Sequence, residues 1–80
     1  MNKTTRKKID DMKTKLEAMQ SDLEAIRDAE QDAFDSKSER WQEGEKGEAA
    51  RAVIDGLNSA CDSLTEVVGV LEDEVLAGED

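Results

Sequence analysis

Few side chains in this 80-residue chain could do chemistry. Histidine, the commonest general base and neutral metal ligand, is absent, and the single cysteine is Cys61. The densest group of carboxylates is Glu72-Asp73-Glu74, followed by Glu79 and Asp80. A metal site would need oxygen ligands that converge from a structured loop, whereas neighbouring helical positions point in different directions. This cluster therefore indicates a solvated helix end.

A second acidic pair, Glu45-x-x-Glu48, is similar to half of the magnesium site of all-α nucleotide pyrophosphatases. The other half of such a site, a Glu followed three residues later by Asp, is absent. Cys61 lies on an apolar row of the second half of the chain, where we expect it to fill space as a small apolar group. We therefore expect no enzymatic activity, no cofactor and no bound metal.

The first half of the chain carries apolar residues at alternating spacings of three and four, which is the pattern of a coiled-coil heptad abcdefg. Positions a and d hold Ile9, Met12, Leu16, Met19, Leu23 and Ile26, taken alternately. Proline is absent from the whole chain. The pattern predicts a helix over about residues 5–34, and its narrow stripe suits contact with one neighbouring helix.

The second half carries a broader stripe. Position a holds Ala50, Leu57, Leu64 and Leu71, position d holds Val53, Ala60 and Val67, and position e holds Ile54, Cys61, Val68 and Val75. The adjacent g edge holds the small residues Ala49, Gly56 and Ser63, which would let a neighbour approach closely. This pattern predicts a helix over about residues 46–76 that covers more than one partner surface.

Residues 35–45 separate the two stripes and form the predicted tip. Ser36 and Glu39 have the spacing of a capping box, which predicts a single helical turn that carries Trp41 and ends at Gly44. We expect the rings of Phe34 and Trp41 to plug the open end of the core at this tip.

Charge favours a chain that folds back on itself. Residues 1–15 hold six basic and two acidic side chains, and residues 52–80 hold eight acidic side chains and no basic one. An antiparallel arrangement brings these oppositely charged ends together, although each exposed ion pair contributes only ~0–1 kcal/mol. The sequence thus predicts an all-α fold, an antiparallel two-helix coiled-coil hairpin that forms a single domain over residues 1–80.

A hairpin of this size has a small core, and such cores rarely supply more than ~3–5 kcal/mol. Two helices alone are expected to leave the e row of the second helix facing water. Two hairpins that dimerise into a four-helix bundle would cover this row. The predicted homodimer or partner interface consists of Ile54, Leu57, Cys61, Leu64, Val68, Leu71 and Val75.

The net charge of −10 limits the kinds of partner. Direct nucleic-acid binding is not expected, because phosphate contacts need a positive surface. The longest uncharged run is about six residues, against the ~20 that a membrane-spanning helix needs, so we expect no membrane partner and a cytoplasmic location.

The acidic side chains around the tip allow an alternative function. A rod with spaced carboxylates can imitate the phosphates of a duplex, and its field would steer it into a basic groove. The chain would then inhibit a host DNA- or RNA-binding protein of defence or regulation. The candidate mimic surface consists of Glu17, Asp22, Glu24, Asp28, Asp32, Asp35 and Glu39. The other interpretation is an ordinary soluble helix surface.

The central third of the chain resembles small acidic helical proteins of phages and prophages. The stretches that carry the resemblance are Arg27-Asp28-Ala29-Glu30-Gln31-Asp32-Ala33-Phe34-Asp35, Ser38-Glu39-Arg40-Trp41-Gln42 and Glu45-Lys46-Gly47-Glu48-Ala49. This sequence departs from that pattern at residues 36–38, Ser-Lys-Ser, where the family has a proline-rich turn. Because the family has no agreed activity, the resemblance implies only a phage or prophage accessory protein. The sequence as a whole predicts a non-enzymatic protein–protein interaction protein that acts as a homodimer.

Overall fold

The computed structural model describes residues 1–78 as a succession of helices. These are α1 (Lys3–Asp35), α2 (Glu39–Glu43), α3 (Glu45–Val70) and a π-helix, η1 (Leu71–Leu76). No strand occurs among these residues, so the prediction of an all-α protein is confirmed. Glu79 and Asp80, which belong to the C-terminal acidic cluster, lie outside the described residues.

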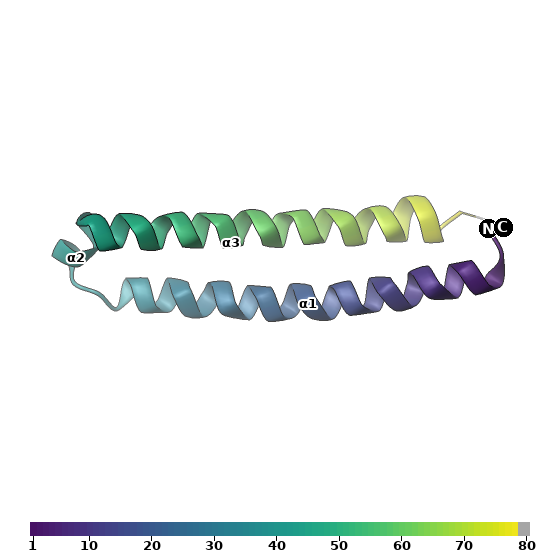
Figure 1. The fold of residues 1–80 in the computed structure, drawn as a ribbon, viewed down its shortest axis with the longest axis horizontal. Coiled ribbons are helices and arrows are strands. Elements are labelled where there is room, and N and C mark those ends of the chain that lie inside the picture. Colours follow the sequence, from purple (N-terminus) through teal and green to yellow (C-terminus); the bar gives the residue numbers. More distant parts are fainter. Residues whose placement is uncertain (79–80) are drawn as a thin grey trace.

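Helices α1 and α3 lie side by side and run in opposite directions (Figure 1). The described chain measures 58 × 16 × 13 Å, so it is a rod about two helices wide. Helix α2 lies at one end of the rod, and the first residues of α1 and η1 meet at the other end (Figure 1). Within residues 1–78, no helix combines the length and the apolar character that crossing a membrane requires.

Helix α1 is held at both ends by side-chain caps. The Asn2 side chain accepts a hydrogen bond from the backbone amide of Thr5 at 2.8 Å, which satisfies one of the free donors of the first turn. At the other end, the Ser36 hydroxyl donates to the Ala33 carbonyl at 2.8 Å. Ion pairs four residues apart, Lys7–Asp11 and Lys13–Glu17, add support along the surface.

The turn differs in detail from its sequence prediction. The N-cap of α2 is Ser38, whose hydroxyl accepts from the Trp41 amide at 3.2 Å, so the predicted capping box of Ser36 and Glu39 is wrong. Ser36 is instead the C-cap of α1, and Lys37 separates it from the N-cap of α2. Gly44 ends α2, as predicted, and directly starts α3.

The side of α1 that faces α3 also differs from the prediction. The d residues Met12, Met19 and Ile26 are 53–59% exposed, so the predicted a/d seam is wrong for contact within the chain. Apart from Glu24 at position b, the half-buried residues of α1 lie at positions a and e: Arg6, Ile9, Lys13, Leu16, Gln20, Leu23, Arg27 and Phe34. Long polar side chains can occupy such positions because their aliphatic stems pack while their heads reach water.

Helix α3 faces α1 with the same two heptad positions. Its e residues Ile54, Cys61 and Val68 are only 6%, 2% and 9% exposed, and they form the hydrophobic core of the described chain. The expectation that an isolated helix pair leaves this row facing water is therefore wrong. The a residues of α3, from Ala50 to Leu71, are half-buried beside it.

Polar contacts fix the register of the two long helices. The Gln20 amide donates to the Thr65 hydroxyl at 2.8 Å, and the Arg6 guanidinium donates to the Gly78 carbonyl at 2.9 Å. Gln20 is thus level with Thr65, whereas a chain that folds back on a loop centred near Trp41 is predicted to align Met19 with Leu64. The two long helices are therefore shifted by about two residues from the predicted alignment.

The π-helix η1 changes the phase of the last turn. A π-helix has a wider turn than an α-helix and is rare at this length. Val75 and Leu76 are consecutive, yet both are half-buried, as is Leu71 one turn earlier. The wider turn therefore directs adjacent apolar side chains toward the start of α1, where the sequence had predicted a regular helix to about residue 76.

Gly47 gives a test of the tip. This glycine is buried, and a Cβ there would overlap the backbone carbonyl of Gln42. We expect Gly47→Ala to lower the free energy of unfolding by about 1–3 kcal/mol, since the backbone must shift. Urea denaturation at fixed protein concentration, followed by circular dichroism, measures this change.

Gly69→Ala is the matched control, because a Cβ at Gly69 has nothing within 4 Å. Helix propensity alone should then raise the stability by up to about 1 kcal/mol. Equal effects of the two substitutions would contradict the close approach of α2 to the start of α3.

Candidate interaction surface

The most exposed large apolar residues lie along both long helices. On α1 they are the d residues Met12, Met19 and Ile26, and on α3 they include the d residues Val53 and Val67, which are 54% and 45% exposed. A scattered exposed apolar residue is normal, but a row that follows the length of a rod marks an interaction surface.

The two d rows lie on the same side of the rod. In each long helix, the direction midway between positions a and e points at the other helix. Successive residues turn by about 100°, so position d lies about 80° to one side of that direction. The second helix faces the opposite way and also runs the opposite way, and because these two inversions cancel, both d rows lie on the same side of the rod. We call the surface formed by Met12, Met19, Ile26, Val53, Ala60 and Val67 the apolar face.

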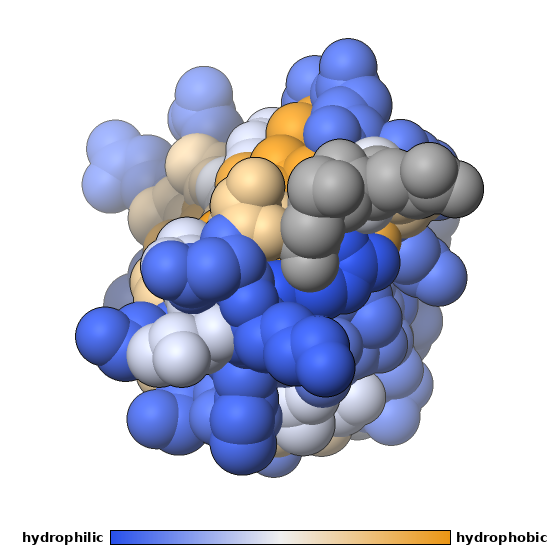
Figure 2. Space-filling view, turned by 90° about the vertical axis from the view of Figure 1, so that its right-hand side faces the viewer, coloured by the Kyte–Doolittle hydropathy of each residue, from blue (hydrophilic) through white to orange (hydrophobic). Residues whose placement is uncertain are grey.

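The side of the rod opposite the apolar face is polar. Figure 2 looks from the end that holds the termini, where hydrophobic residues gather in the upper part of the view, at the end of the second long helix, and hydrophilic residues cover most of the rest. The side opposite the apolar face carries a polar connection: the Gln20 amide donates both to the Thr65 hydroxyl at 2.8 Å and to the Glu24 carboxylate at 3.4 Å. The two long sides of the rod therefore differ in chemistry.

The g edge of α3 borders the apolar face with small residues. Ala49, Gly56 and Ser63 are all exposed. Gly56 costs a helix roughly 1 kcal/mol relative to Ala, and a Cβ at Gly56 would have nothing within 4 Å. The fold of the single chain therefore gives no reason for this glycine, whereas close approach by another molecule would give one.

The residues predicted for the dimer interface divide into two groups. Ile54, Cys61 and Val68 are covered by α1 of the same chain and have little surface left for a partner. The others are half-buried and border the apolar face or the end of the rod: Leu57, Leu64, Leu71 and Val75. The sequence pattern missed this division because it did not assign the e row of α3 to the contact within the chain.

The structure brings together the two aromatic residues of the predicted tip plug. The rings of Phe34 and Trp41 meet edge to face, with centroids 6.2 Å apart and planes at 65°. The Lys37 ammonium lies 5.4 Å from the Trp41 ring centroid, and the Arg51 guanidinium lies 5.3 Å from that of Phe34. Both rings are half-buried, so each keeps one side exposed.

Gln42 holds this tip together, although nothing in the sequence pattern had singled it out. Its side-chain amide donates to the Phe34 carbonyl at 2.9 Å and to the Lys37 carbonyl at 3.2 Å. It thereby adds a second hydrogen bond to the Phe34 carbonyl, which also accepts from the Lys37 amide at 3.1 Å, and ties the last turn of α1 to the connection that follows it. A glutamine with this role has no sequence signature, because it acts across the turn.

The candidate mimic surface is spread over the outward side of α1. Six of its carboxylates, from Glu17 to Asp35, occupy heptad positions away from α3, and all but Glu24 are exposed. Asp28 accepts from the Arg27 guanidinium at 3.1 and 3.2 Å, and this hydrogen bond raises the pKa of Arg27 above its ordinary value. Lys13 lies 3.4 Å from Glu17, so two of the carboxylates already have a cation beside them.

The remaining chemical candidates are Cys61 and the other carboxylates. Cys61 is 2% exposed, consistent with a space-filling role. Within residues 1–78, no group of three or more His, Cys, Asp or Glu side chains could hold a metal ion.

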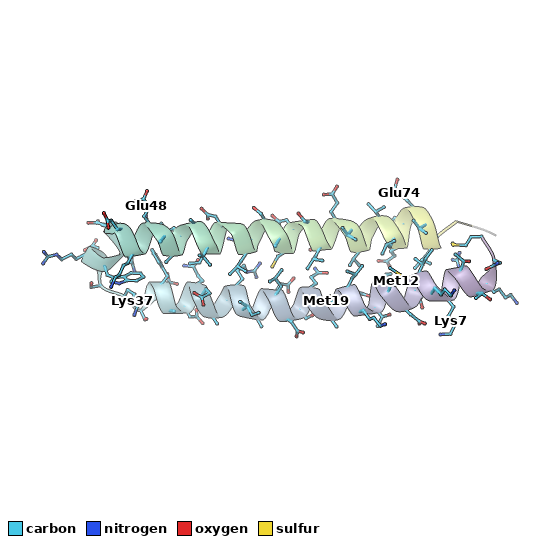
Figure 3. All side chains as sticks on the ribbon, viewed as in Figure 1. Lys7, Met12, Met19, Lys37, Glu48 and Glu74 are labelled. Carbon is cyan, nitrogen blue, oxygen red and sulfur yellow. The ribbon has the colours of Figure 1, made fainter. Side chains whose placement is uncertain are left out.

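A shallow hollow at the terminal end is lined by Lys3, Arg6, Lys7, Asp10 and Leu76. Lys7 and Glu74 project away from the opposite long helix (Figure 3).

A scan against protein-family models, a search of curated proteins and a search of solved structures find no match to this chain.

Trp41 provides a test of the tip plug. We expect Trp41→Ala to lower the free energy of unfolding by about 1–3 kcal/mol, because it removes a half-buried ring and an edge-to-face contact that is itself worth about 0.5–1.5 kcal/mol. Trp41→Phe keeps an aromatic ring and should retain most of the stability. Thermal unfolding by circular dichroism compares the two, and an alanine variant as stable as the parent would refute the plug.

Proposed function

We propose that this chain is a non-enzymatic protein–protein interaction protein that acts as a homodimer. Its unit is an antiparallel coiled-coil hairpin, and two hairpins pack into a four-helix bundle. The observation that supports this proposal is the apolar face, which follows both long helices and, apart from the half-buried Ala60, is exposed among the described residues. Rows of this kind are buried at the centre of helix bundles.

The arrangement of the heptad positions also supports a bundle. In a bundle of four helices, positions a and d point toward the common axis. The a residues of this chain, such as Leu16 and Leu64, are half-buried, and the d residues Met19 and Val67 are exposed. A second copy on the apolar face would complete the burial of the a residues and cover the d residues. The a/d stripe predicted for α1 would then form the contact between the two copies.

Energetics point in the same direction. The buried hydrophobic residues among those described are Ile54, Cys61 and Val68 alone, which is a small core for a chain of this length. Full burial of a large apolar side chain contributes ~1.5–3 kcal/mol, so covering one that is half exposed contributes about 1 kcal/mol. Each d residue covered at a dimer interface adds to a stability that the separate chain lacks.

The proposed setting is the cytoplasm, as an accessory protein of a phage or prophage. The setting rests on the resemblance of the central third of the chain to small acidic helical proteins of those elements. The absence of histidine and the burial of Cys61 support a role without catalysis.

Self-association is tested by analytical ultracentrifugation across nanomolar to micromolar concentrations. We expect a species of twice the 8.8 kDa chain mass at micromolar concentration. Helical content, followed by circular dichroism, should fall on dilution as the dimer dissociates. A folded species of single chain mass throughout this range would refute the homodimer.

A second candidate function is a nucleic-acid mimic that blocks a basic DNA- or RNA-binding protein of the host. It is supported by the exposed carboxylates of α1, of which Asp28, Asp32 and Asp35 lie on the outward side that a dimer built on the apolar face would leave free. Helical rise places Glu17 and Asp35 about 27 Å apart, which is comparable with the length of several phosphate steps of a duplex.

The mimic is tested by pull-down from a bacterial lysate in the presence of competing duplex DNA. Capture should weaken steeply as salt rises and should be displaced by the DNA, because it depends on screened charges. The triple variant Asp22→Asn, Asp28→Asn, Asp32→Asn should lose capture while keeping its helical content. Capture that resists salt and duplex DNA would exclude mimicry and leave the homodimer proposal intact.

A further inference from the structure

We infer that the occupant of the apolar face is a second copy of this chain that docks with its tip beside the first tip, so that α1 of each copy packs on α3 of the other. The inference rests on the proposed homodimer and adds its geometry. Two arrangements bring apolar faces together in a symmetric dimer. A two-fold axis along the rod pairs α1 with α3, and an axis across the rod pairs like helices and places the tips at opposite ends.

Side-chain size favours the pairing of unlike helices. The apolar face of α1 presents the large residues Met12, Met19 and Ile26. The corresponding side of α3 presents the smaller residues Val53, Ala60 and Val67 and, on its g edge, Gly56 and Ser63, and a Cβ at Gly56 would have no described atom within 4 Å. Large side chains fit beside small ones, because interiors are packed to high density without voids. Like-helix pairing would instead set the larger α1 row against itself and the smaller α3 row against itself.

The register within one chain predicts the register between copies. An axis along the rod leaves every residue at its own level, so a residue of α1 is level with the same residue of α3 in either copy. Gln20 is level with Thr65. Counting from this pair, Met19 is level with Glu66 and Ile26 with Ser59, so Met19 meets Ser63 and Val67, and Ile26 meets Gly56 and Ala60.

Charge supports the same geometry. Lys15 lies on the g edge of α1 and is exposed, and by the same counting it is level with Val70 of α3. Glu66, one turn before Val70, lies on the outer side of the apolar face and is exposed, and Asp73 is exposed in the first turn of the π-helix that follows Val70. None of these three charged side chains has an ion pair within the described chain. With the tips together, the Lys15 ammonium of one copy reaches the two carboxylates of the other across the small g edge.

The arrangement is tested by pulsed electron paramagnetic resonance on spin labels at exposed positions. Glu43→Cys places a label at the tip, and Thr4→Cys places one at the opposite end, while Cys61 is buried and stays unlabelled. With tips together, both variants give distances between copies of about 15–30 Å, because neighbouring helices lie 8–10 Å apart. With tips at opposite ends, the two labels of each variant lie at opposite ends of the dimer, and their distance approaches the 58 Å length of the rod.

Substitutions test the face and the charges separately. Met19→Glu should raise the dimer dissociation constant at least about 100-fold, because it buries a charge. Ser21→Glu, which adds the same charge on the outward side of the same helix, should change it less than about threefold. Lys15→Glu should weaken the dimer about 3- to 10-fold, and adding Glu66→Lys and Asp73→Lys should restore it.

The outcomes separate this inference from the proposed function. A dimer with long distances at both label sites, or with no rescue by the α3 substitutions, overturns the docking geometry and leaves the homodimer standing. A dimer that is indifferent to Met19→Glu overturns the use of the apolar face. A protein that is monomeric at micromolar concentration overturns both. Short distances together with the charge rescue establish the geometry.

Discussion

Each long helix of this chain has only one long neighbour, and one neighbour can cover only one side of a helix. Helix α3 carries apolar residues on heptad positions a, d and e, and this stripe is too wide for α1 alone to cover. The structure buries the e row against α1, leaves the a row half covered, and exposes Val53 and Val67 at position d. The exposed rows of both helices, and with them the case for a partner, follow from this limit on coverage.

The same limit explains why the sequence predicted the helices well and their contact less well. The alternation from Ile9 to Ile26 identifies a long first helix, and the structure has Lys3–Asp35. Lys13, Gln20 and Arg27 lie outside the apolar a/d stripe, yet all three are half-buried on the side of α1 that faces α3. The aliphatic parts of their side chains pack as apolar groups do. A heptad pattern that classifies whole residues as apolar or polar cannot predict this packing.

The tip shows where residue patterns stop being informative. Phe34 and Trp41 were identified as a plug because large aromatic residues rarely stay solvated, and the structure places their rings in contact. Gln42 and Gly47 were missed, although one closes the backbone of the turn and the other allows α2 to approach α3. Both depend on distances between atoms across the turn. Such distances are set by the fold and leave no periodic trace in the sequence.

The methionines of α1 carry one more consequence. Met12 and Met19 expose more than half of their surface in the separate chain, so their thioether sulfurs are open to oxidants. Conversion to the sulfoxide makes an apolar, flexible side chain polar. Such a change would place oxygen atoms in the middle of the surface that a partner has to cover. Packing against that partner would shield the sulfurs, so assembly and oxidation would compete for the same two side chains.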